Sequence, residues 1–483
     1  MMNVLFVSNE VAPFAKVGGL ADVAGSLPGA IAARGVDIRV VMPLHRSCPA
    51  IEECSVVLPA LSVQTPYRAL VPAVLESTLN GSDVPVYFIK YDRFFDRPDP
   101  YGEGASDYPD SPQRYAFFAR AALALNHALG FGADVIHAND WPAGLLPAFQ
   151  RLNPFGRPTV FTIHNLGYQG SFPLTVAREI DIDPVSPAMP LVQLRDRINY
   201  MAAAIRSATV VNTVSERYAR EIQSPGFGHG LDDLLRDRAE DLHGILNGID
   251  YDEWNPRRRS ALPATFGFDR LEGKARCKAA LQERLGLEVN PKVPLAVAVS
   301  RLVYQKGLDV LAEVLPGAVK RPMQFALLGT GDPELERLYR ALAQANPGRV
   351  AASIEYNEDL ARLHYAGSDI FIMPSRYEPC GLGQMIAMAF GSVPVVHATG
   401  GLADTVAEAV SEPTGFVCRY LAPQDLLSAI TRALDAYHDD PRRWGALVRR
   451  VMRRDFSWER SAKEYVTLYE KAREAGRDTQ AAR

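Results

Sequence analysis

Short runs rich in β-branched and aromatic residues alternate with longer segments of helical periodicity along this chain of 483 residues. In the first half the runs fall at 4–7, 37–42, 86–89, 134–137, 159–163 and 209–213. They are largely apolar rather than alternating, as expected of parallel strands that helices cover on both faces. The pattern therefore predicts a doubly wound α/β fold.

The alternation breaks at 242–256, where Gly, Asn, Asp and Pro accumulate, and resumes with runs at 294–300, 325–329, 369–374 and 393–397. We place a domain boundary near residue 245, which predicts domains over 1–245 and 246–455. The remaining segment, 456–483, predicts a helix that packs back toward the first domain and ends in a frayed tail. Two open α/β domains facing across a cleft would bind ligands beyond the carboxyl ends of their strands.

A pair of glycines, Gly18 and Gly19, follows the first predicted strand and opens a helix, with Lys16 just before it. Backbone amides at a helix start can approach an anion closely where no Cβ intervenes, and Lys16 adds a positive charge. A tight turn without a ligand is the alternative for the glycine pair. The spacing differs from the dinucleotide and P-loop patterns, which lowers the case for either.

The second half offers two similar sites. Arg301 and Lys306 lie between a predicted strand and a helix, and Thr399, Gly400 and Gly401 do the same further on. A nucleoside diphosphate that leaves during a transfer reaction gains negative charge, which cations and fixed amides can stabilise. These positions suit such a diphosphate.

A divalent metal ion could stabilise the same charge, so we considered a metal-binding motif. The one D-x-D sequence, Asp181 to Asp183, does not end a clear apolar strand, and we favour a loop or helix-capping role for it over a metal site. We therefore predict catalysis without a metal ion or another cofactor.

Several side chains at predicted strand ends could carry chemistry. Glu378 lies in a loop constrained by Pro and Gly, where a purely structural carboxylate at a helix start is the alternative. His137 and His164 are predicted at strand ends, and a satisfied hydrogen-bonding role is as plausible for each as a functional one. Asp140 beside Trp141 suits a sugar, which offers hydroxyls at its rim and C–H groups on its face, while a core role for Trp141 is equally open.

Charge and cysteine content narrow the partners. The net charge of −4 and an isoelectric point near 6.2 give no general attraction to nucleic acid or to an anionic membrane. Five scattered cysteines form no paired motif, and no signal peptide or membrane span is recognisable, so we expect a reducing, cytoplasmic location. A neutral polymer or a small metabolite is the expected partner.

Seven blocks in order along the chain resemble the signature blocks of bacterial glycogen synthases and plant starch synthases. They are KVGGLADV (16–23), HANDW (137–141), TIHNLGYQG (162–170), ILNGIDYDEWNP (245–256), SRLVYQKG (300–307), PSRYEPCGL (374–382) and TGGLADTV (399–406). The resemblance implies a GT-B fold of two Rossmann-like domains. It also implies metal-independent, retaining transfer of glucose from ADP-glucose to the non-reducing 4-hydroxyl end of an α-1,4-glucan such as glycogen.

In the second domain the resemblance assigns the nucleotide sugar. It implies that Glu378 is the essential carboxylate near the sugar, that Arg301 and Lys306 neutralise the diphosphate, and that Tyr356 lies near the adenine. The other positions that it implies for substrate binding there are Cys380, Gly381, Leu382, Thr399, Gly400 and Gly401.

In the first domain, the glucan acceptor side, the resemblance implies that Lys16 and Gly19 border the phosphate and sugar of the donor. His164 would contact the glucose hydroxyls, with Asp140 and Asn165 nearby. The further positions implied for substrate binding are Gly18, Asp22, which would serve donor or acceptor, and Asn247.

The chain departs from related patterns at four positions, one of which, Gly226 in place of an expected acidic residue, concerns a loop. Ile386 stands where many retaining enzymes of this fold carry a second Glu, and glycogen synthases share this absence. His397 stands where a basic Arg is expected, and Ala389 where Lys or Arg is common. These differences bear on donor affinity and leave the preference for ADP-glucose over UDP-glucose open.

Alternatives remain for both mechanism and function. Retention requires either a covalent intermediate or attack on the same face as the departing phosphate. We favour same-face attack because the motifs offer no nucleophile better than Glu378, which the family pattern places elsewhere than beneath the anomeric carbon. Another retaining transferase of the same fold, such as a sucrose synthase or a glucan phosphorylase, is the nearest alternative enzyme. A non-catalytic glucan-binding relative is the alternative of another class.

Overall fold

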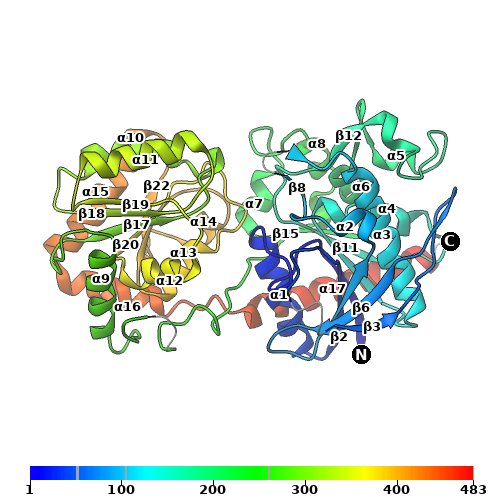
Figure 1. The fold of residues 1–483 in the computed structure, drawn as a ribbon, viewed down its shortest axis with the longest axis horizontal. Helices are drawn as coiled ribbons and strands as arrows, with labels where there is room; N and C mark the ends of the chain where they lie inside the picture. The colour runs from blue at the N-terminus through cyan, green and yellow to red at the C-terminus, as the bar shows by residue number, and fades with distance from the viewer. Residues whose placement is uncertain (50–53, 104–105, 259–261, 482–483) are drawn as a thin grey trace. The chain divides into compact units, whose positions relative to one another are not determined.

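The computed structural model describes residues 1–49, 54–103, 106–258 and 262–481. The chain divides into two compact units, each with its own sheet (Figure 1). Unit 1 comprises Met1–Gly248 together with the C-terminal segment that begins at Trp458, and unit 2 comprises Ile249–Ser457. Each unit is an α/β layer structure, so the predicted fold class is confirmed.

The described part of unit 1 is built on a sheet of nine strands, in the order β16-β15-β11-β10-β1-β2-β7-β6-β3. Seven of these strands run parallel, whereas β6 and β3 add an antiparallel edge that the sequence pattern did not predict. In sequence order the strands are β1 (Met2–Val7), β2 (Val36–Pro43), β3 (Ser55–Leu58), β6 (Ala73–Thr78), β7 (Pro85–Lys90), β10 (Val135–Asn139), β11 (Thr159–Ile163), β15 (Val210–Thr213) and β16 (Leu242–Gly244).

Both faces of this sheet are buried, which explains why its strands are apolar without alternation. In β1, Leu5 and Val7 join one core cluster, while Val4 and Phe6 join the cluster on the opposite face. The first cluster lies under helices α3 (Ser111–Ala128), α4 (Leu145–Leu152) and α6 (Tyr200–Ser207), and the second under α1 (Gly19–Ala32) and α17 (Trp458–Ala481). Burying a large apolar side chain contributes on the order of 2 kcal/mol.

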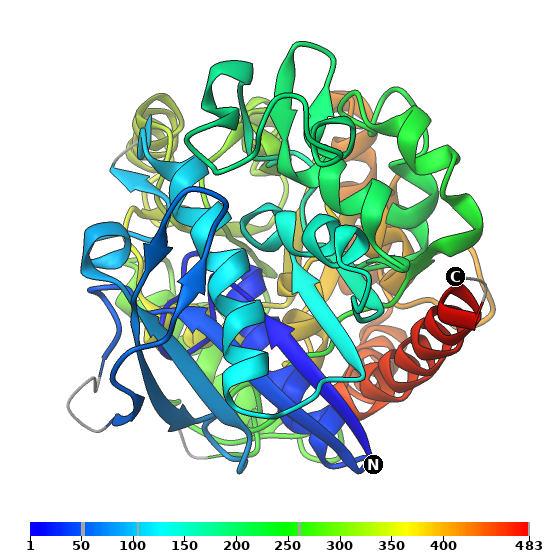
Figure 2. The same cartoon turned by 90° about the vertical axis from the view of Figure 1, so that its right-hand side faces the viewer.

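The last helix, α17, belongs to unit 1 although unit 2 precedes it in the sequence (Figure 2). Its buried residues recur at helical spacing: Trp458, Ala462, Tyr465, Tyr469 and Ala472. These residues pack in the core cluster that also contains residues of α1 and β1. The tail predicted to fray includes residues 482–483, which lie outside the described residues.

Unit 2 contains, in its described part, a parallel sheet of six strands in the order β19-β18-β17-β20-β21-β22. Helices lie on both faces of it (Figure 1). The strands are β17 (Leu295–Val299), β18 (Gln324–Leu328), β19 (Val350–Ser353), β20 (Ile370–Met373), β21 (Val393–His397) and β22 (Phe416–Cys418). The main helices are α9 (Glu272–Arg284), α10 (Leu308–Ala318), α11 (Pro333–Ala345), α12 (Glu358–Gly367), α13 (Gly383–Ala389), α15 (Pro423–Asp439) and α16 (Pro441–Met452).

Each sheet has a point at which the strand order reverses direction. In unit 1 the chain builds outward from β1 to β2 and later returns to β10 on the other side of β1. In unit 2 the same reversal lies between β17 and β20. Because the loops at such a point diverge to opposite faces of the sheet, they leave room for a ligand at the carboxyl ends of the strands.

Candidate active site

The loop after β1 of unit 1 carries the first group of predicted residues. Gly18 is the N-cap of α1, Gly19 is its first residue, and the Lys16 ammonium lies 2.7 Å from the Asp22 carboxylate in the first helical turn. Both side chains of this ion pair are about one-third exposed, at 31% and 28%. The pair therefore holds Lys16 over the start of the helix while leaving it accessible to solvent.

Glu10 is a residue of this loop that the sequence analysis missed. One of its carboxylate oxygens accepts hydrogen bonds from the backbone amides of Val17 and Gly18, at 2.6 and 2.9 Å. Of the two glycine amides predicted at this helix start, that of Gly18 binds a carboxylate of the chain itself. The Gly18 amide thus organises the loop, and its role in substrate binding stays a prediction. A glutamate shortly after the first predicted strand is the sequence signal that could have identified Glu10.

The other oxygen of Glu10 accepts a hydrogen bond of 2.5 Å from the hydroxyl of Tyr101. Burial raises the pKa of Glu10, and the bonds from Tyr101 and the two amides act against that rise. The loop is consequently held by a carboxylate that is itself tied to a distant segment of unit 1. Glu10 also lies near enough to Asp140 to raise the pKa of that residue.

Asp140 follows β10, beside β1 in the sheet, and binds the loop after β11. One of its carboxylate oxygens accepts the amide of His164 at 2.8 Å and that of Asn165 at 3.4 Å. Burial raises the pKa of Asp140 to about 7, although these two bonds lower it. The structure thus brings Asp140, His164 and Asn165 together at the carboxyl edge, as the sequence predicted for neighbouring strand ends.

The ring of His164 is held in one orientation. Its Nε2 lies 2.9 Å from Oδ1 of Asn139, whose amide nitrogen donates to the Val7 carbonyl. The Asn139 oxygen is therefore the acceptor, so Nε2 of His164 carries the proton and Nδ1 is an acceptor. Burial lowers the pKa of His164 to about 3, which keeps the ring neutral. Such a ring can accept a hydrogen bond from a sugar hydroxyl but cannot supply a positive charge.

Two residues of the same region prove to be structural. His137 lies within β10 rather than at its end, and its ring nitrogens contact the hydroxyls of Tyr469 and Thr162 at 2.8 and 2.7 Å. Trp141 is 7% exposed and packs edge-on against Tyr115, with ring centroids 4.7 Å apart. The core alternative for Trp141 is the one that the structure supports.

Asn247, at the end of unit 1, is buried with 6% exposure. Among the described residues its Oδ1 has no hydrogen-bond partner. A buried amide oxygen of this kind is uncommon because it loses its hydration without compensation. It is therefore consistent with the substrate-binding role that the sequence assigned to Asn247, which stays a prediction.

In unit 2 the loops after β17 and β20 are docked on each other. Gly307 adopts a φ of 63°, and a Cβ atom there would lie 2.0 Å from the carbonyl oxygen of Pro374, so only glycine allows this approach. The guanidinium of Arg376 binds both carboxylate oxygens of Asp309, at 2.7 and 2.6 Å. A bidentate pair of this kind fixes orientation as well as distance.

Because the two loops are docked, the side chain of Lys306 lies beside that of Glu378. The Lys306 ammonium lies 2.6 Å from Oε2 of Glu378, and the hydroxyl of Ser375 donates to the same oxygen at 2.8 Å. Glu378 is 6% exposed, which makes it a buried carboxylate with a cation and a hydroxyl as partners. The two residues that were predicted to act at the diphosphate and the sugar are thus in direct contact.

The other predicted residues of unit 2 take several positions. Arg301 is exposed at the end of β17, and Tyr356, 74% exposed, follows β19 and donates from its hydroxyl to Glu358. Cys380 is buried, and Gly381 and Leu382 are half-buried in the loop before α13. Gln384, which the sequence analysis missed, holds this loop by donating to the carbonyls of Cys380 and Gly381.

The glycines at the start of α14 (Gly400–Thr405) pack closely against the loop that carries Glu378. The amide of Gly401 donates to the Glu378 carbonyl at 3.1 Å, and a Cβ on Gly400 would lie 1.9 Å from that same oxygen. Thr399 is the buried N-cap residue of this short helix. The close approach of the loop that carries Glu378 requires these glycines, and their role in substrate binding stays a prediction.

No group of three or more His, Cys, Asp or Glu side chains among the described residues is arranged to hold a metal ion. Asp181 forms an ion pair with Arg68 at 3.3 Å, and Asp183 accepts the amide of Val185. The D-x-D sequence thus has the loop role that was favoured for it.

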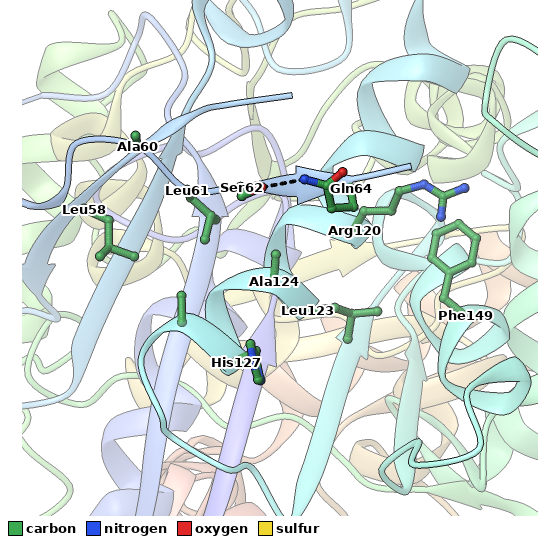
Figure 3. A pocket seen from close by; sticks show the side chains of 11 residues that line it. Leu58, Ala60, Leu61, Ser62, Gln64, Arg120, Leu123, Ala124, His127 and Phe149 are labelled. Atoms are coloured by element: carbon green, nitrogen blue, oxygen red, sulfur yellow. Dashed lines mark hydrogen bonds between the residues drawn. The ribbon is translucent and has the colours of Figure 1, made fainter. Parts of the chain in front are cut away.

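A separate pocket of unit 1, of about 520 Å³, lies between the segment 58–64 and α3 (Figure 3). Three of its polar side chains bind other groups of the chain: Gln64 donates to Ser62, and Arg120 stacks on Phe149 while donating to the carbonyls of Ile180 and Asp181. None of the residues predicted for the site lines this pocket.

In the part of the chain that the structure describes, no helix is long and apolar enough to cross a membrane.

The comparisons with known protein families and proteins cover nearly the whole chain. Residues 3–237 match the starch synthase catalytic domain, and residues 282–450 match the glycosyl transferases of group 1. The glycogen synthase of Syntrophotalea carbinolica is 45% identical over 98% of this chain and 99% of its own length. That of Moorella thermoacetica is 43% identical over 99% of this chain and 98% of its own.

Two solved structures are similar to the chain over nearly its whole length. The catalytic domain of starch synthase IV from Arabidopsis thaliana, bound to ADP and acarbose, is 33% identical with a TM-score of 0.89, covering 98% of this chain and 99% of that one. Sucrose-phosphate synthase from Thermosynechococcus elongatus, at 20% identity and a TM-score of 0.60 over 98% of this chain and 99% of that one, shares the fold.

Proposed function

The chain belongs to the family of bacterial glycogen synthases and plant starch synthases, and from this we infer that it is a glycogen synthase. It transfers glucose from ADP-glucose to the non-reducing 4-hydroxyl end of an α-1,4-glucan and releases ADP. Relatives at 41–46% identity over almost the entire chain support this activity, as does a related structure bound to ADP.

The contact between Lys306 and Glu378 carries the proposal at the level of residues. A transferase must stabilise a diphosphate that gains charge and must place a carboxylate beside a sugar that loses its leaving group. Lys306 and Glu378 bring a cation and a carboxylate to one point at the β17–β20 reversal, 2.6 Å apart. A non-catalytic glucan-binding relative would be marked by loss of the charged residues, and Lys16, Arg301, Lys306 and Glu378 are all present.

We propose that unit 2 binds the nucleotide sugar. Arg301 and Lys306 compensate the diphosphate charge, Tyr356 offers an exposed ring to the adenine, and Glu378 lies near the transferred glucose. Two further segments form part of this site: the loop from Cys380 to Leu382, and the helix start at Thr399, Gly400 and Gly401. Support comes from the docked loops, since Arg376 and Asp309 fix the segment on which Glu378 lies.

For unit 1 we propose sugar-binding roles. The neutral ring of His164 accepts a hydrogen bond from a glucose hydroxyl, and the Asp140 carboxylate holds this loop by accepting from the backbone amides of His164 and Asn165. Lys16, Gly18, Gly19 and Asp22 border the substrate at the start of α1, and the orphaned oxygen of Asn247 accepts from it. Hydrogen bonds from neutral groups such as the His164 ring suit uncharged sugar hydroxyls, whereas Lys16 borders the phosphate and sugar of the donor.

We further propose that the reaction retains the anomeric configuration by same-face attack and needs no metal ion. The bond from the anomeric carbon to the phosphate oxygen breaks as the bond to the glucan 4-oxygen forms. The proton of the 4-hydroxyl passes to the departing phosphate oxygen. Glu378 favours positive charge on the sugar in this scheme, and the positively charged side chains at the diphosphate replace a metal ion.

We also propose a cytoplasmic location. All five cysteines lie in the described part of the chain, and none of them forms a disulfide there. Thiols that stay reduced are typical of proteins in a reducing compartment.

The proposed function is tested with purified protein, ADP-glucose or UDP-glucose, glycogen and EDTA. We expect ADP release that requires glycogen and is unchanged by EDTA, with ADP-glucose as the better donor. Absence of glycogen-dependent ADP release would contradict the synthase function. Activity that disappears with EDTA and returns with a divalent ion would contradict the metal-independent mechanism alone.

A further inference from the structure

His397, at the end of β21, is one of the positions where this chain departs from related patterns. The residue is half-buried, and its Nδ1 lies 2.7 Å from the carbonyl oxygen of Ser375. A carbonyl oxygen only accepts hydrogen bonds, so Nδ1 must carry the proton and donate it. Protonation of the ring adds its proton at Nε2, and the bond to Ser375 therefore exists whether the ring is neutral or charged.

The bond continues a strand pairing that has just ended. β20 and β21 pair in parallel up to Met373 and Val396. Ser375 lies two residues beyond that point on one strand, and His397 lies one residue beyond it on the other. The imidazole thus provides a cross-link at the place where the backbone ladder stops and the loop carrying Glu378 begins.

Ser375 links the His397 side chain to the Glu378 carboxylate. It is fully buried, and its hydroxyl donates to Oε2 of Glu378 at 2.8 Å. The same oxygen accepts from Lys306 at 2.6 Å. A displacement of Ser375 would remove one of the two donors that orient the carboxylate.

Other bonds hold the rest of the loop independently of His397. Arg376 is fixed to Asp309, and the Glu378 carbonyl accepts the amide of Gly401 at 3.1 Å. Loss of the His397 bond would therefore leave the loop folded and shift the part of it nearest Ser375. The expected consequence is a misplaced carboxylate rather than an unfolded unit.

We propose that His397 is a positioning residue for Glu378 in the transfer reaction, acting through the Ser375 carbonyl and the Ser375 hydroxyl. The proposal rests on the proposed glycogen synthase function. His397 contacts neither Glu378 nor Lys306 by any bond found among the described residues, so its effect is on orientation. It assigns a function to the imidazole that stands where related chains are expected to carry a guanidinium.

The test compares His397→Ala, His397→Asn and His397→Gln. The amide nitrogen of Asn is attached to Cγ, as Nδ1 of His is, whereas the amide nitrogen of Gln lies one bond further out, as Nε2 does. We expect His397→Ala to lower kcat about tenfold, with the KM for ADP-glucose changed less than about twofold. His397→Asn recovers kcat to within about threefold of the wild type, and His397→Gln resembles His397→Ala.

Several outcomes would overturn the proposal. Wild-type kcat in all three variants would show that the bond does not matter for the reaction. Recovery by Gln but not by Asn would assign the effect to Nε2, and a KM that rises in parallel with the loss of kcat would indicate a binding role. If His397→Ala does not fold, as judged from its melting temperature, the order of Asn and Gln decides. Inactivity of the wild type itself contradicts the proposed function instead.

Discussion

The Lys306 ammonium and the Glu378 carboxylate lie 2.6 Å apart although 72 residues separate them in the sequence. Their side chains are 15% and 7% exposed, so solvent screens this ion pair only weakly. Removing one partner leaves a buried charge uncompensated, which is more costly than losing a surface ion pair. The two residues must therefore be tested together as well as singly.

Glu378→Gln is expected to lower kcat more than about a hundredfold because it removes a fixed negative charge where the sugar develops positive charge. The amide keeps the shape of the side chain, so the fold is retained. Glucan-dependent ADP release and a thermal melt measure the two effects. Glu334→Gln, at a side chain 87% exposed in α11, is the matched control and should leave kcat unchanged. Near-normal activity of Glu378→Gln would remove it from the reaction.

Lys306→Met is expected to weaken ADP binding at least about tenfold, because it removes a cation proposed to face the diphosphate. Titration calorimetry with ADP measures this directly. Lys320→Met, at an exposed residue of the same unit, serves as the control. In the double variant with Glu378→Gln the losses in kcat/KM should not add, because the two side chains are in contact. Additive losses would argue that the ion pair is unimportant in the active enzyme.

Asp140 is expected to make stability depend on pH. Burial raises the pKa of Asp140 from 3.8 to about 7, so the folded state holds this proton more tightly than the unfolded chain. Its contribution to stability is present at low pH and is lost as pH rises from about 4 to about 7. Asp140→Asn keeps an acceptor oxygen and tolerates the φ of 53° at this position.

The free energy of unfolding of Asp140→Asn, relative to the wild type, should rise by up to about 3 kcal/mol between about pH 5 and pH 7.5. Urea unfolding at a series of pH values measures it. Asp233→Asn, at a side chain that is 91% exposed, is the control. A difference that does not change with pH would show that Asp140 is ionised throughout this range.

Tyr469→Phe is expected to destabilise unit 1 by about 1–3 kcal/mol, because it leaves a ring nitrogen of His137 buried without its partner. Urea unfolding with and without the substitution gives the value. Tyr420→Phe, at a residue 69% exposed, should have an effect below about 0.5 kcal/mol. An equal effect of both substitutions would mean that the contact between α17 and β10 contributes little.

The sequence predicted the central strands of both sheets, because an apolar run of strand length is a local property of the sequence. It did not predict the antiparallel edge of β3 and β6, whose residues are partly exposed and carry a weaker pattern. It predicted Glu378, Lys306 and Arg301 from their place after strands. It missed Glu10 and Gln384, because each acts through backbone groups that no motif identifies.

The order of apolar runs, the glycines before helices and the seven family-like blocks determined the α/β class and the transferase function of this protein. These are features of neighbouring residues, and local periodicity and motif spacing record them directly. Only the tertiary structure decided which partner each polar group has: the amide of Gly18 binds Glu10, the amide of Gly401 binds the Glu378 carbonyl, and His397 binds Ser375. Such pairings join segments that are distant in sequence, and the packing of the whole unit sets them.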